Sequence, residues 1–170
     1  SLGADAINNA VVDMLDVLKG EKNICFLHST GKFGFWVEDK LKEKNIPYGK
    51  CTNIEIRPYI DNMDICLSAC DRVISRAGAS SISEIQALKK PSILIPSPNV
   101  AENHQFHNAM AIVKNDGAIL IEEKDLDGKY LAQKIMELKN DRIKLYRISQ
   151  NAGKGAKVDA LSEICRIITS

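Results

Sequence analysis

The chain has 170 residues, of which 45% are hydrophobic, and a formal net charge of +1. This length predicts one domain with a full core over residues 1–170. Charges of both signs are scattered along the chain, so we expect no nucleic-acid partner. The sequence shows no signal peptide and no apolar stretch of about 18 residues, so we expect no segment that spans a membrane.

The cysteine pattern argues against a metal site. The five cysteines are Cys25, Cys51, Cys66, Cys70 and Cys165. They form no CxxC pair, and His104 and His107 have no convincing third ligand nearby. We therefore expect no metal and no cofactor, with free thiols in a reducing cytoplasm.

Apolar spacing predicts alternating helices and strands along the chain. The predicted helices are 7–18 (after a possible cap at Asp5), 36–44, 63–70, 82–88, 102–114 and a helical tail over 127–168 with breaks near Asn140 and 153–155. The predicted strands are 24–27, 54–56, 73–74, 93–95 and 119–121. This alternation favours an α/β fold, in which a parallel sheet is covered by helices on both faces.

Ligands of parallel sheets bind at the carboxyl ends of the strands. Three loops follow predicted strands at that edge, namely 28–34, 75–81 and 96–103. The segment 75–84 combines a strand end, a turn of small residues and a helix start. Free amides in the first helical turn and the positive end of the helix dipole favour a phosphate over residues 78–81. Glu84 could then accept hydrogen bonds from the hydroxyls of a ribose.

Three residues of this segment also have simpler interpretations. Ser81 and Glu84 match a capping box, in which they satisfy the first amides of a helix, and the pattern alone favours this interpretation over ribose binding. Arg76 could bring a full positive charge to a diphosphate. A solvated arginine at a strand end is about as common.

Several stretches resemble the carboxyl-terminal half of the MurG family of N-acetylglucosaminyl transferases. The matching stretches are SLGA at 1–4, YIDNM at 59–63, SRAGASSISE at 75–84, PSPNVAENHQ at 96–105 and Asn108-Ala109. The resemblance covers nearly the whole chain. It implies a Rossmann-like, doubly wound parallel sheet that forms one half of a glycosyltransferase-B architecture, with a helical carboxyl-terminal tail.

The resemblance also implies roles for individual residues in binding UDP-N-acetylglucosamine. Ser1 and the loop 76–81 would contact the diphosphate, the backbone of Ile60 the uracil, Glu84 the ribose, and His104 and Gln105 the sugar. The implied binding residues are Ser1, Ile60, Arg76, Ala77, Gly78, Ala79, Ser80, Ser81, Glu84, His104 and Gln105. The resemblance favours ribose binding by Glu84 over the capping interpretation.

The family pattern has an apolar strand before Ser1, and this chain begins after it. We therefore expect the first central strand and the amino-terminal acceptor domain, which binds lipid I, to be absent, leaving neighbouring strand edges unpaired. The residues usually considered catalytic belong to that half, so this chain alone would be inactive.

The resemblance implies transfer of N-acetylglucosamine to lipid I, forming lipid II in peptidoglycan synthesis. It places the full-length enzyme in the cytoplasm or at the cytoplasmic face of the bacterial membrane, with peripheral association through the absent half. Two alternatives stay open: a UDP-N-acetylglucosamine epimerase-like domain, and a non-catalytic module that binds UDP-sugars.

Overall fold

The computed structural model describes residues 3–50, 52–157 and 159–169. The chain separates into two compact units. Unit 1 comprises Ser1–Met63 and Lys124–Asn140, and unit 2 comprises Asp64–Glu123 and Asp141–Ser170. The sequence-based prediction of a single domain stays a prediction.

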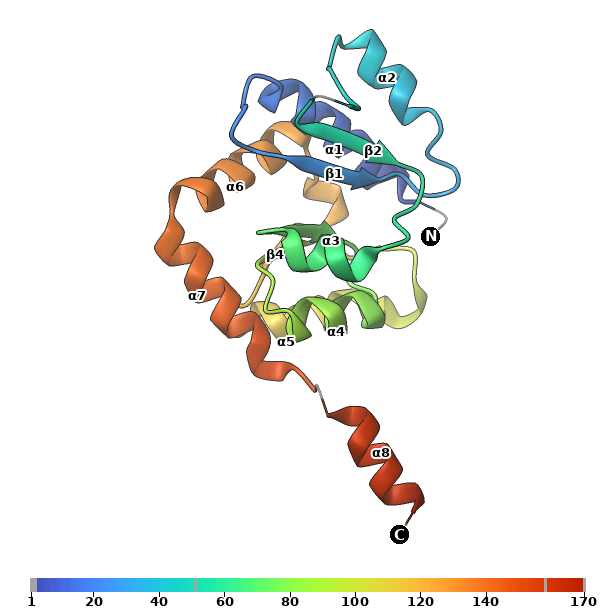
Figure 1. Ribbon diagram of the computed structural model, residues 1–170, viewed down its shortest axis with the longest axis vertical. Helices are drawn as coiled ribbons and strands as arrows, with labels where there is room; N and C mark the ends of the chain where they lie inside the picture. Colours follow the sequence, from blue (N-terminus) through green and yellow to red (C-terminus); the bar gives the residue numbers. More distant parts are fainter. Residues whose placement is uncertain (1–2, 51, 158, 170) are drawn as a thin grey trace. The chain divides into compact units, whose positions relative to one another are not determined.

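Unit 1 contains a two-stranded parallel sheet and three helices. Its elements are α1 (Asp5–Leu18), β1 (Phe26–Ser29), α2 (Val37–Glu43), β2 (Ile54–Arg57) and α6 (Gly128–Asn140). Phe26 of β1 is in register with Ile54 of β2. The apolar stripe of α1 is buried and packs beside α6 (Figure 1). A Cβ on Gly128 would come within 2.4 Å of the Asp13 Cβ, so the close approach of α6 to α1 requires glycine there.

Unit 2 contains a three-stranded parallel sheet in the order β3-β4-β5. Its strands and main helices are α3 (Met63–Ala69, whose first residue belongs to unit 1), β3 (Val73–Ser75), α4 (Ala79–Ala87), β4 (Ser92–Leu94), α5 (His104–Val113), β5 (Ile119–Leu120), α7 (Arg142–Ala152) and α8 (Ala160–Ile168). Three short 3-10 helices are η1 (Ala101–Asn103), η2 (Glu123–Asp125, whose last two residues belong to unit 1) and η3 (Gly153–Gly155). The core of this unit joins α4, α5 and the sheet through Ala77, Ile82, Ile85, Leu94, Ala109, Ile112 and Ala118.

The predicted class of fold, a parallel α/β arrangement, is confirmed, and both sheets have an open edge. Within the described residues β1 pairs with β2 alone and β3 pairs with β4 alone. The free edge of each strand presents backbone donors and acceptors without a strand partner. The absence of a first central strand stays a prediction.

The first strand begins two residues later than predicted, at Phe26 instead of residue 24. The side-chain Nδ2 of Asn53 donates to the backbone carbonyl oxygens of Glu21 (3.0 Å) and Ile24 (2.6 Å). The Phe26 amide then donates to the Asn53 carbonyl at 2.7 Å and starts the ladder. At Ile24 the side chain of Asn53 therefore takes the place of a neighbouring strand. His28, which was predicted to lie in the following loop, is part of β1.

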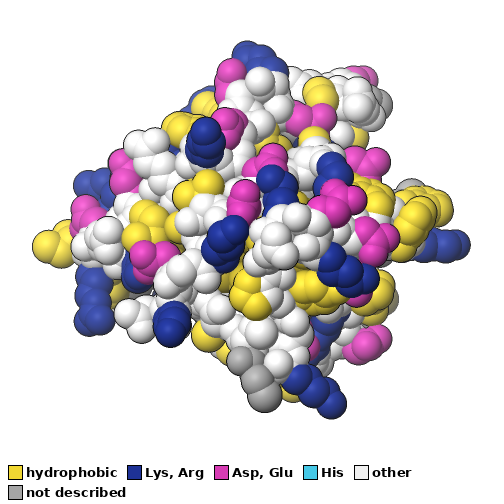
Figure 2. Space-filling model, turned by 90° about the horizontal axis from the view of Figure 1, so that it is seen from above, with side chains coloured by type: hydrophobic (Ala, Val, Ile, Leu, Met, Phe, Trp, Pro, Cys, Tyr) yellow, Lys and Arg dark blue, Asp and Glu magenta, His cyan; other side chains and the backbone are white. Residues whose placement is uncertain are grey.

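The surface agrees with the charge pattern of the sequence. Figure 2 shows acidic and basic side chains mixed over the face that it presents, without a large patch of one sign. None of the helices in the described part of the chain combines the length and apolar composition that a bilayer crossing requires.

His28 should make stability depend on pH. Burial lowers the pKa of His28 from 6.5 to about 4. The unfolded chain therefore takes up a proton below about pH 6.5 while the folded chain does not, so stability falls as the pH drops toward 4. In H28Q this loss should be smaller by on the order of 2–3 kcal/mol between pH 7 and 4.5, measured as free energy of unfolding in urea.

The exposed His107 on α5 provides the matched variant H107Q. Its pH profile should follow that of the parent chain. A parent profile as flat as that of H28Q would contradict a partly buried His28 that stays neutral in the folded chain.

Candidate nucleotide site

The start of α4 presents three free backbone donors. Gly78 is the N-cap, with φ −67 and ψ 151, and the first helical hydrogen bond runs from the Ile82 amide to the Gly78 carbonyl at 2.9 Å. The amides of residues 79–81 precede that bond, and within the described chain none of them has an acceptor. Ala79 and Ser80 are exposed, so the predicted anion seat is open to solvent.

The predicted capping box at Ser81 and Glu84 is wrong. The helix α4 begins at Ala79, three residues earlier than predicted, which makes Ser81 its third residue and not its cap. Gly78 caps the helix with its extended backbone alone, and the favourable helix former Ala79 starts the first turn. The exposed Glu84 carboxylate makes no hydrogen bond within the described residues, so it is available to a ligand.

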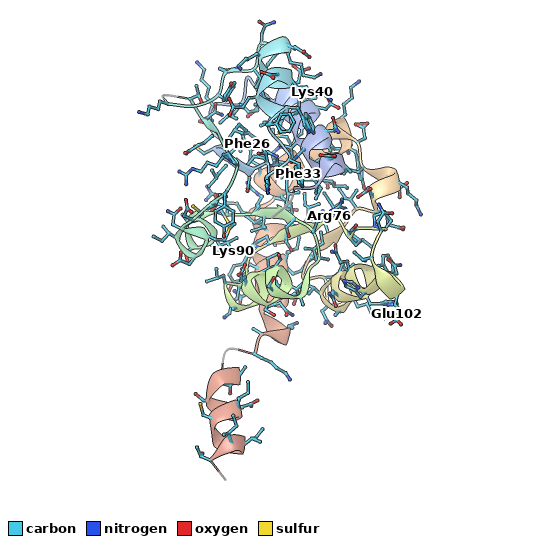
Figure 3. The ribbon with its side chains drawn as sticks, turned by 90° about the vertical axis from the view of Figure 1, so that its right-hand side faces the viewer. Phe26, Phe33, Lys40, Arg76, Lys90 and Glu102 are labelled. Atoms are coloured by element: carbon cyan, nitrogen blue, oxygen red, sulfur yellow. The ribbon has the colours of Figure 1, made fainter. Side chains whose placement is uncertain are left out.

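Arg76 joins the carboxyl ends of all three strands of unit 2. Its Nη2 lies 2.5 Å from Oε2 of Glu123, which follows β5. Its Nη1 donates to the carbonyl oxygens of Ile95 and Pro96, which follow β4, at 3.2 Å each. The side chains of Arg76 and Glu123 are only 23% and 25% exposed, so the interpretation as a solvated arginine is wrong. Figure 3 labels Arg76 at this edge of the sheet.

The pairing of Arg76 bears on its predicted role at a diphosphate. Glu123 already balances the guanidinium charge, so the net electrostatic attraction that Arg76 offers an anion is small as long as this pair holds. The free amides at the start of α4 are therefore the stronger candidates for anion contact. A contact from Arg76 to a diphosphate stays a prediction.

Asn108 holds the turn between β3 and α4 through a hydrogen bond to its backbone. Its Nδ2 on α5 donates to the carbonyl of Ala77 at 3.1 Å, and Ala77 is fully buried. No role for Asn108 or Glu123 was predicted from the sequence. Asn108 lies one helical turn after His104, and Glu123 lies just beyond a strand end, so helical spacing and the strand-end rule were the signals that could have found them.

His104 and Gln105 are the first two residues of α5, directly after a sharp turn of the backbone. Glu102 and Asn103 both adopt left-handed backbone conformations, each with φ 52, which turn the chain into the helix (Figure 3 labels Glu102). Gln105 Oε1 accepts a hydrogen bond from the Ser97 amide at 2.9 Å. Its amide nitrogen has no acceptor in the described part of the chain, while His104 is exposed. Gln105 can therefore still donate to a hydroxyl.

The roles predicted for Ser1 and Ile60 stay predictions. Ser1 lies outside the described residues. Ile60 belongs to unit 1, where its side chain is 7% exposed. Among the described residues, no three His, Cys, Asp or Glu side chains are grouped to hold a metal ion.

A parallel sheet with free helix amides and polar side chains at the carboxyl ends of its strands is an arrangement that many nucleotide-binding α/β domains share. Comparison with known proteins makes the assignment specific. Residues 1–164 match the family described as "Glycosyltransferase family 28 C-terminal domain", and the chain belongs to this family.

Curated relatives have one name in common, UDP-N-acetylglucosamine--N-acetylmuramyl-(pentapeptide) pyrophosphoryl-undecaprenol N-acetylglucosamine transferase. The protein of that name from Desulforamulus reducens is 38% identical over 99% of this chain and 45% of its own length. That from Flavobacterium psychrophilum is 40% identical over 100% of this chain and 45% of its own length. The chain thus spans about half the length of these relatives.

Solved structures support the same fold. The crystal structure of Acinetobacter baumannii MurG matches with a TM-score of 0.83 at 24% identity, covering 99% of this chain and 47% of that one. The C-terminal domain of a glycosyl transferase group 1 family protein from Francisella tularensis matches with a TM-score of 0.60 at 19% identity, covering 85% and 74%. The fold is therefore the Rossmann-like one of a glycosyltransferase-B carboxyl-terminal half, as predicted.

The ion pair of Arg76 and Glu123 should stabilise unit 2. E123Q leaves a partly buried guanidinium without its counter-charge, so we expect a loss of about 1–3 kcal/mol in the free energy of unfolding. The control D39N removes the exposed pair of Lys42 and Asp39 (62% and 73% exposed) and should change stability by less than about 0.5 kcal/mol. Urea unfolding measures both, and equal small changes would refute the structural role of Glu123.

Proposed function

We propose that this chain is the UDP-sugar-binding half of an inverting glycosyltransferase. The complete enzyme moves N-acetylglucosamine from UDP-N-acetylglucosamine to lipid I and forms lipid II in peptidoglycan synthesis. The curated relatives carry a name that states this donor and acceptor type, and the free amides at the start of α4 provide a seat for the diphosphate. The second observation carries the proposal because it concerns this chain's own atoms.

The proposed reaction places most of the new charge on the leaving group. The C4 hydroxyl of the muramyl unit attacks C1 of N-acetylglucosamine, the bond from C1 to the diphosphate oxygen breaks, and UDP leaves with inversion at C1. Negative charge grows on the diphosphate as that bond lengthens. The amides of residues 79–81 are oriented in advance, so they stabilise the departing group more than the bound substrate.

Gly78 supports close approach of a ligand. Its φ of −67 suits any residue, and a Cβ built there meets no atom within 4 Å. Neither backbone conformation nor packing thus requires glycine at this position. A phosphate that approaches the backbone would require it.

The nucleoside and the sugar would extend from the diphosphate in opposite directions. The uncommitted Glu84 carboxylate accepts hydrogen bonds from the two ribose hydroxyls, and Gln105 and His104 contact hydroxyls of N-acetylglucosamine. By resemblance, Ser1 contacts the diphosphate and the backbone of Ile60 reads the uracil. Arg76 would act on the diphosphate chiefly by holding the turn in place, since Glu123 balances its charge.

None of the residues named above would bind the acceptor. Lipid I and the groups that activate its hydroxyl would be held by the amino-terminal half that the family resemblance implies. The same half would attach the enzyme to the cytoplasmic face of the membrane. This chain alone should therefore bind UDP-N-acetylglucosamine without transferring its sugar.

Replacing Glu84 should separate ribose recognition from phosphate binding. E84A should weaken UDP about ten- to hundredfold in calorimetry, because hydrogen bonds to a charged group are lost. Affinity for pyrophosphate should stay the same or rise slightly, because a nearby negative charge is removed. E163A, which removes an exposed glutamate from α8, is the control and should bind UDP as the parent does. Equal losses for UDP and pyrophosphate would remove the ribose assignment.

Replacing Gly78 tests the approach of the phosphate. G78A should fold with a loss of no more than about 1 kcal/mol, because the conformation is allowed and only the cap preference changes. UDP affinity should fall about tenfold, since the methyl group stands between the amides and the ligand. G20A is the matched control, because Gly20 also has open surroundings and follows the carboxyl end of α1, where no ligand contact is predicted. A G78A variant with parental UDP affinity would place the diphosphate elsewhere.

A further inference from the structure

The guanidinium of Arg76 is only partly used by contacts within unit 2. Its Nη1 donates to the carbonyl oxygens of Ile95 and Pro96, and its Nη2 faces Glu123. A guanidinium has five N–H donors, and here the one on Nε has no acceptor among the residues that the structure describes. Arg76 can therefore keep its contact with Glu123 and still donate to a phosphate.

Glu123 brings a negative charge close to the predicted anion seat. Its Oε2 lies 2.5 Å from Nη2 of Arg76 and is buried from solvent, so this charge is screened less than an exposed one. Arg76 follows β3 directly and precedes the N-cap Gly78 by two residues. The ion pair and the free amides of residues 79–81 therefore both lie beyond the carboxyl end of β3. A diphosphate at these amides would feel the carboxylate as well as the guanidinium.

The substrate and the product of the proposed reaction differ in charge. Each phosphate of UDP-N-acetylglucosamine has one ionised oxygen. The product UDP ends in a free phosphate, which loses a second proton at a pKa of about 6. A cation without a counter-charge would attract UDP more strongly than the substrate. Arg76 without Glu123 would thus favour the product.

We propose that Glu123 weakens the binding of UDP to this site, so that the product leaves and a new donor substrate can bind. This inference rests on the proposed function. Glu123 is a positioning residue that acts through the guanidinium whose charge it balances, and it need not touch the ligand. Such an effect matters for turnover, because the release of product is the slow step of many enzymes.

Three variants test the proposal through one ratio, the affinity for UDP divided by the affinity for UDP-N-acetylglucosamine. E123Q keeps the shape of the side chain and leaves the guanidinium charge unbalanced. R76Q does the reverse and leaves the carboxylate unbalanced. The control E163Q removes an exposed negative charge from α8, so it changes the net charge of the chain as E123Q does. The ratio cancels any loss that affects both ligands alike, such as a looser turn.

Calorimetry at pH 8 without divalent cations measures both affinities, because UDP then carries its full charge. E123Q should raise the ratio about three- to tenfold, and R76Q should lower it about as much, because the ligands differ by one charge. E163Q should keep the parental ratio. E123Q should also bind UDP more tightly than the parent chain, although it unfolds more easily.

A carboxylate that only braces the turn would give a different result. E123Q would then weaken both ligands by the same factor, and an unchanged ratio would overturn the inference. A rise of the ratio in E163Q equal to that in E123Q would overturn it as well. Where E123Q does not fold, an unchanged ratio in R76Q has the same consequence.

The failure of this inference can be told apart from the failure of the proposed function. A parent chain that binds neither ligand would refute the proposed function, and the inference with it. A parent chain that binds both ligands, combined with an unchanged ratio in E123Q, would refute the inference alone.

Discussion

The candidate site depends on three backbone amides that the helix α4 cannot satisfy by itself. Residues 79–81 lie before the first helical hydrogen bond, so their N–H groups point out of the helix end and have no acceptor among the residues that the structure describes. Exposed amides of this kind favour an anion, and the helix dipole adds to the preference. Other features of unit 2 determine whether these amides stay in one arrangement.

The surrounding contacts fix the turn from two sides. Arg76 draws the ends of β3 and β4 toward Glu123 after β5, and Asn108 holds the carbonyl of Ala77 from α5. The buried apolar residues of α4, Ile82 and Ile85, attach the helix itself to the sheet. A rigid support of this type lets the amides act on a charged transition state without reorganising. One exposed contact with a helix end is worth about 0.3–1 kcal/mol, so several aligned donors are needed for a useful effect.

Much of the fold followed from the spacing of apolar residues, while the ends of elements did not. Every predicted strand and helix in the core of the two units has a counterpart in the structure. The start of β1 was missed because Asn53 replaces a strand partner near Ile24, a contact between segments distant in sequence. The start of α4 was missed because a glycine capped the helix with its backbone, which leaves no side-chain signal.

In the site, too, local features were predicted from the sequence, and contacts between distant segments were not. Small residues before a helical pattern predicted the free amides around Gly78, because that property is local. The pairing of Arg76 with Glu123 was not predicted, because only the folded sheet brings their strand ends together.

A titration of this chain with UDP, followed by amide chemical shifts, shows directly whether the start of α4 binds the diphosphate. The largest saturable shifts should fall on the amides of residues 78–81. A UDP titration that leaves these amides unmoved, or that moves only amides elsewhere in the chain, would contradict it.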